Sequence, residues 1–169
     1  MKVQSVNNRQ NFNGKLIPEG FGKRSADLKR WSGNISKIYE HVTDQYPNDT
    51  LYVKKNKYDY CTVLDLTFNM EGSEYTGQLK HRDAGAFQRL DDEQIAEKLA
   101  HITQIIHEGK KLIEKGLKMT KEFSEMFPLN EEAIMDEMST EVRAITQSYI
   151  QERIDTVAQG FLFKDGAGY

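Results

Sequence analysis

The sequence predicts an α+β fold: an N-terminal helix, a three-stranded antiparallel meander and a long antiparallel helical hairpin. Two patterns carry this prediction. Apolar and polar residues alternate from Tyr58 to Met70, as in a strand with one buried face. Apolar or small residues recur every seven positions from Asp91 to Phe127, which is typical of a long amphipathic helix. Only three residues, 128–130, separate this helix from a second helical pattern, which favours a hairpin.

The chain is expected to form one domain with four parts. These are a basic extended arm (1–24), a helix with an antiparallel sheet (25–90), the hairpin (91–160) and a C-terminal tail (161–169). A chain of 169 residues can bury about 70% of its unfolded surface, so its stability requires neither a metal nor a disulfide. The lone Cys61 fits a reducing compartment. Because no signal-peptide core or long apolar run is present, we expect a cytoplasmic location.

The first helix is expected to begin after Ser25 and to end before Pro47. Its apolar stripe contains Leu28, Trp31, Ile35, Ile38, Tyr39 and Val42. The expected strands follow at 50–54, 58–70 and 74–80, with turns at 55–57 and 71–73. The segment 12–17 could add a fourth strand at the edge.

The first helix of the hairpin is expected to be capped by Asp91 and stopped by Pro128, and the second to run from Asn130 to Gly160. Six residues of the first helix are candidate helix-packing residues: Ile102, Gly109, Leu112, Gly116, Met119 and Phe123. The two glycines allow two interpretations. They could form a groove in which another helix approaches closely, or they could mark a bend or break.

The N-terminal arm is basic, although the whole chain has a net charge of -3. Its candidate contacts to nucleic acid or to a partner are Lys2, Arg9, Lys15, Lys23, Arg24, Lys29 and Arg30. Such an arm could bind phosphates or an acidic surface of a neighbouring subunit, and it could equally be an ordinary solvated terminus.

Motifs for catalysis are weak. His101 and His107 are six residues apart, which does not place them at ligand spacing on one helix face, so we interpret both as exposed helix histidines. The tripeptide His81-Arg82-Asp83 resembles the kinase catalytic loop only in these three letters, and Gln88 replaces the expected Asn. It remains a candidate polar loop site. We expect no metal site and no cofactor.

No motif identifies a family, so the sequence allows only a choice among broad classes of function. The leading hypothesis is a non-enzymatic structural or protein-interaction protein that assembles through the coiled-coil-like hairpin and the arm, as a homo-oligomer or with a protein partner. The alternative is a nucleic-acid-associated protein that uses the basic arm. An enzyme is the third and least supported class.

Overall fold

The computed structural model describes residues 15–58, 61–81 and 90–160. The α+β class is confirmed, because a four-stranded mixed sheet combines with helices and two long C-terminal helices pack together. In chain order the elements are β1 (Lys15–Glu19), α1 (Ala26–Arg30), η1 (Trp31–Ile35), α2 (Ser36–Val42), β2 (Thr50–Tyr58), β3 (Cys61–Met70), β4 (Ser73–His81), α4 (Asp92–Ser124) and α5 (Glu131–Gly160).

The sheet has the order β1-β2-β3-β4. Strands β2, β3 and β4 pair antiparallel, and β1 joins the edge of β2 in the parallel direction, so the sheet is mixed. The turn predicted at 55–57 is wrong, because β2 continues to Tyr58 and pairs with β3 throughout. Asn56, within that segment, donates a side-chain hydrogen bond to Asp65 on β3, which ties the polar residues of the two strands together.

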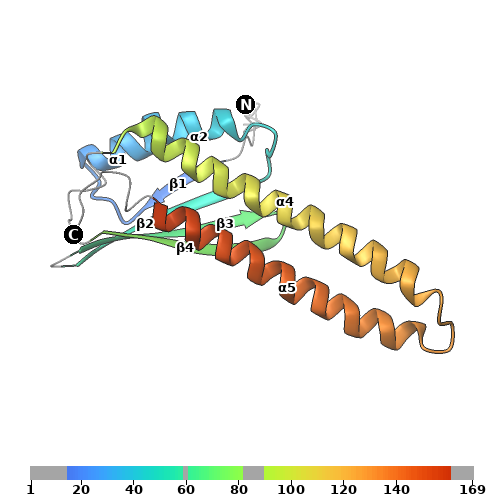
Figure 1. Cartoon of the computed structure of the whole chain (residues 1–169). Coiled ribbons are helices and arrows are strands. Elements are labelled where there is room, and N and C mark those ends of the chain that lie inside the picture. The colour runs from blue at the N-terminus through green and yellow to red at the C-terminus, as the bar shows by residue number, and fades with distance from the viewer. Residues whose placement is uncertain (1–14, 59–60, 82–89, 161–169) are drawn as a thin grey trace, which may run out of the picture.

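One face of the sheet forms the core. Leu64, Leu66, Phe68 and Met70 alternate along β3 and are fully buried, as the strand period of two requires. The opposite face is polar, and Gln78 on β4 donates to the Asp65 carboxylate there. Helices cover the apolar face (Figure 1).

The single N-terminal helix predicted from the sequence consists of three consecutive helical pieces. Ser25 caps α1 by accepting a hydrogen bond from the Leu28 amide at 3.1 Å, and a π-helical turn, η1, connects α1 to α2. The side chains of Trp31, Ile35 and Tyr39 point into the core. The helix ends at Val42, before the expected stop at Pro47.

The two long helices run antiparallel and extend past the sheet (Figure 1). Asp91 caps α4 by accepting from the Glu93 amide at 2.9 Å. The 33 residues of α4 span about 50 Å at 1.5 Å per residue. The helix is continuous through both glycines, so the interpretation of a break is wrong.

Candidate interaction surface

The hydrophobic core reaches only part of the way along the hairpin. The last core residue on α4 is Ile106, and the first on α5 is Ile150. Beyond Lys110, which still donates to the Met70 backbone oxygen, the helices have each other as their neighbours, and Figure 1 shows them leaving the sheet together. The outer half of the hairpin, residues 111–149, therefore has to satisfy its apolar side chains without the sheet.

Small residues of α4 form the seam with α5. A Cβ built on Gly109 would lie 2.3 Å from Cγ1 of Ile150, and one built on Gly116 would lie 2.7 Å from Cγ1 of Val142. Further out, Thr120 and Ser124 are buried, and their hydroxyls donate to backbone oxygens of their own helix. The seam is thus too narrow for large side chains on α4.

Large apolar residues gather on the exposed surface of this outer half. Among the described residues, ten large apolar side chains are exposed, and eight of them lie between positions 112 and 149. Five belong to the helices and are called the hairpin face here: Leu112, Met119, Phe123, Ile145 and Tyr149. The other three, Met126, Phe127 and Leu129, form the tip.

The hairpin face lies on one side of the helix pair. Leu112 and Met119 each follow a seam glycine by three residues, and Ile145 follows Val142 by three. Two antiparallel helices are related by a local two-fold axis perpendicular to the plane that contains both of them. Residues that follow a contact residue by the same number of positions, one on each helix, therefore lie on the same side of that plane. The two remaining members follow Met119 and Ile145 by four residues and extend the same stripes.

The sheet lies on the other side of the hairpin. Ile154 follows Ile150 by four residues, and a Cβ built on Gly77 of β4 would lie 3.0 Å from its Cγ2. Gln151 also donates to the backbone oxygen of Thr76 at 2.8 Å. Around the helix axis, a residue three positions after a contact residue is rotated by about 60° in one direction, and a residue four positions after it by about 40° in the other. The hairpin face is therefore turned away from the sheet.

The six predicted helix-packing residues separate into three environments. Ile102 is buried in the core beside the sheet, and the two glycines lie in the seam with α5. Leu112, Met119 and Phe123 are about half exposed. These three residues belong to the same broad apolar stripe of α4 as the two glycines. The seam with α5 is too narrow to bury their side chains.

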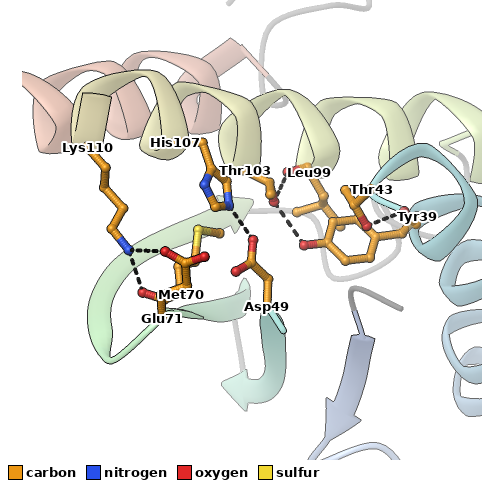
Figure 2. Close-up of polar contacts among 9 residues, drawn as sticks. All are labelled: Tyr39, Thr43, Asp49, Met70, Glu71, Leu99, Thr103, His107 and Lys110. Atoms are coloured by element: carbon orange, nitrogen blue, oxygen red, sulfur yellow. Dashed lines mark hydrogen bonds and ion pairs between the residues drawn. The ribbon is translucent and has the colours of Figure 1, made fainter. Parts of the chain in front are cut away.

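A second set of contacts fastens the inner half of α4 to the rest of the protein (Figure 2). His107 pairs with the carboxylate of Asp49, and its ring stacks on Tyr46 with centroids 3.7 Å apart. The side chains of His107 and Asp49 are 11% and 2% exposed, so the prediction of an exposed histidine at 107 is wrong. His101 is exposed, as predicted. Burial and the nearby charges of Glu108 and Asp49 raise the pKa of Tyr46.

Buried hydroxyls continue this set of contacts. Thr103 donates to the Leu99 backbone oxygen at 3.2 Å, so the Tyr39 hydroxyl, 2.9 Å away, donates to Thr103. Burial is the main cause that raises the pKa of Tyr39 above its usual range. Lys110 donates to the Met70 backbone oxygen at 2.8 Å and lies 3.6 Å from the Glu71 carboxylate. These contacts hold α4 against α2 and the β3–β4 turn.

A shallow cleft beside α2 and α4 includes Tyr46, Glu97 and His101 among its lining residues. Its volume is about 160 Å³, whereas ligand pockets usually measure about 300 to 1,000 Å³. Among the described residues, no three His, Cys, Asp or Glu side chains are placed to hold a metal ion. These features offer less than the hairpin face as a functional site.

The remaining predicted residues are scattered or undescribed. Lys23, Arg24 and Lys29 are exposed, Lys15 lies on β1, and Arg30 binds Asp92 and the Leu90 backbone oxygen. Lys2 and Arg9 lie outside the described residues, as do Arg82, Asp83 and the tail. Only the backbone of His81 is described, at the end of β4.

Within the described part of the chain, no helix has the length and apolar character needed to cross a membrane. No protein-family model matches the sequence, and searches of curated proteins and of solved structures find no similar chain. The surfaces of the structure are therefore what indicates a function for this chain.

Proposed function

We propose that this chain is a non-enzymatic structural or interaction protein that binds a protein through the hairpin face. The observation that supports this is the concentration of large apolar side chains on one side of a hairpin that extends beyond the core. Exposed apolar patches of this kind mark interaction sites in soluble proteins. Aromatic residues and methionine, three of the five members, are also enriched in the cores of protein interfaces.

The geometry suits a partner that packs along helices. The seam holds α4 and α5 in a fixed relation, so the face is presented as two parallel stripes rather than as a mobile loop. Preorganised surfaces lose less conformational entropy on binding. The proposal depends on the hairpin face alone, and the roles expected for residues 1–24, in assembly or in nucleic-acid binding, stay predictions.

Site-specific photo-crosslinking tests the proposal. A photoreactive amino acid replaces Met119 in the full chain, and the protein is irradiated in the cells that naturally produce it. The control places the same amino acid at Lys121, which is exposed and lies about 200° around the helix from position 119. We expect a defined protein adduct at position 119, identified by mass spectrometry, and little at 121. Equal or absent adducts at the two positions would contradict the proposal.

A further inference from the structure

The outer halves of the two helices carry opposite charge. Between residues 111 and 124, α4 has four lysines and two glutamates. Between residues 131 and 145, α5 has five acidic residues and one arginine. The same stretch of hairpin that exposes the apolar stripes is therefore positive along one helix and negative along the other. A binding partner with the reverse arrangement would match it where these charges border the hairpin face.

From this arrangement we infer that the partner is a second copy of this chain, bound so that α4 of each copy lies on α5 of the other. The inference rests on the proposed function, because it assigns an occupant to the same hairpin face. It requires a two-fold axis along the length of the hairpin, which brings both tips to the same end. Each copy then contributes the same patch, as in most symmetric dimers.

The charges select this axis over the other symmetric choice. Two hairpin faces could also meet about a two-fold axis that crosses the helices, with the tips at opposite ends. That arrangement would place α4 on α4 and α5 on α5. The net positive charge of α4 would then lie against itself, and so would the net negative charge of α5, and like charges across an interface oppose association.

The apolar area agrees with a stable dimer. The five side chains of the hairpin face are between 44% and 69% exposed. Since a large apolar side chain has about 200 Å² of surface, they offer on the order of 600 Å² per copy. A stable interface buries about 800 Å² on each partner. The aliphatic stems of the neighbouring lysines can supply much of the difference.

Two charged residues border the face at equivalent positions. Lys115 precedes Met119 by four residues, and Glu141 precedes Ile145 by four, so each is the neighbour of a face residue on its own helix. In the inferred dimer, Lys115 of one copy lies near Glu141 of the other, and the symmetry makes this pair twice. Reversing either charge would replace both attractions by repulsions.

Sedimentation velocity on the purified full chain, at low salt and over a range of concentrations, tests the inference. We expect a concentration-dependent dimer. Lys115→Glu and Glu141→Lys should each raise its dissociation constant about tenfold, and the double variant should return it to near the wild-type value. Met119→Asp should abolish the dimer. Val42→Asp, at an exposed apolar position on α2 away from the hairpin face, should leave it unchanged.

Each other outcome would overturn the inference. A chain that stays monomeric at about 100 μM does not pair with itself, and a dimer unaffected by Met119→Asp uses another surface. If the dimer of the double variant has a dissociation constant no lower than those of the single variants, packing of α4 on α5 is excluded. If the chain is monomeric but crosslinking at position 119 still traps a different protein, the proposed function stands alone. If crosslinking traps nothing, both fail.

Discussion

Replacing Gly109 by alanine tests the seam between α4 and α5. In an open helix this change is stabilising by about 0.8 to 1 kcal/mol, because glycine is a poor helix former. At this position the new Cβ would lie 2.3 Å from Cγ1 and 2.4 Å from Cδ1 of Ile150. Ile150 is fully buried and β-branched, so few rotamers are open to it. Overpacking of this kind costs about 1 to 3 kcal/mol. We expect a net loss of about 1 kcal/mol in the free energy of unfolding.

Urea unfolding followed by circular dichroism measures the change. The control is Gly33→Ala in η1, where a Cβ would have no neighbour within 4 Å. That variant should be more stable by about 0.4 to 1 kcal/mol. Combining Gly109→Ala with Ile150→Ala should give a favourable coupling energy of about 1 kcal/mol, because the added methyl enters the vacated space. Equal stabilisation by Gly109→Ala and Gly33→Ala would refute the close seam.

Three further predictions concern the rest of the fold. Gly20→Ala should destabilise by about 1 to 3 kcal/mol in urea unfolding, because φ is +72° and a Cβ would lie 2.6 Å from a backbone oxygen of β2. Gly22→Ala, with ordinary contacts, should be nearly neutral. His107→Ala should cost about 3 to 5 kcal/mol by leaving the Asp49 carboxylate buried and unpaired, and adding Asp49→Asn should recover part of that loss in the same assay. The raised pKa of Tyr39 means that only the unfolded state releases this proton near pH 10. The contribution of the protonated Tyr39 hydroxyl to the stability of the folded state is complete below that pH and is lost as the pH rises towards the pKa of the folded state. Urea midpoints should therefore fall less steeply above about pH 10 in Tyr39→Phe than in the wild type.

Local sequence patterns predict those helices and strands whose formation depends little on the segments that pack against them. The period of two identifies the buried face of β3, because a strand has only two faces. Asp91 and Pro128 mark the ends of α4 to within a few residues. The extent of β2 is different. Its residues 55–57 have turn-like composition, but pairing with β3 keeps them extended, and strand formation depends on such neighbours more than on composition.

Contacts between distant segments are what the sequence does not reveal. His107 and Asp49 are 58 positions apart, and neither carries a local signal for the other. The missed clue is weak: a histidine close to the apolar stripe of a helix can face the core rather than solvent. In the same way, periodicity assigns Met119 to a stripe but does not say which element, if any, covers that stripe.

The glycines connect the packing of the hairpin to its exposed surface. Large residues at positions 109 and 116 would hold the helices apart, and a wider seam could take in the side chains beside it. With glycine at both positions the helices lie close, and Leu112 and Met119 are directed to the side. Their exposure is therefore a consequence of the same seven-residue repeat that joins α4 to α5. A repeat that closes one interface while presenting a second is the arrangement expected when two hairpins form a four-helix bundle, since each helix then needs two packing faces.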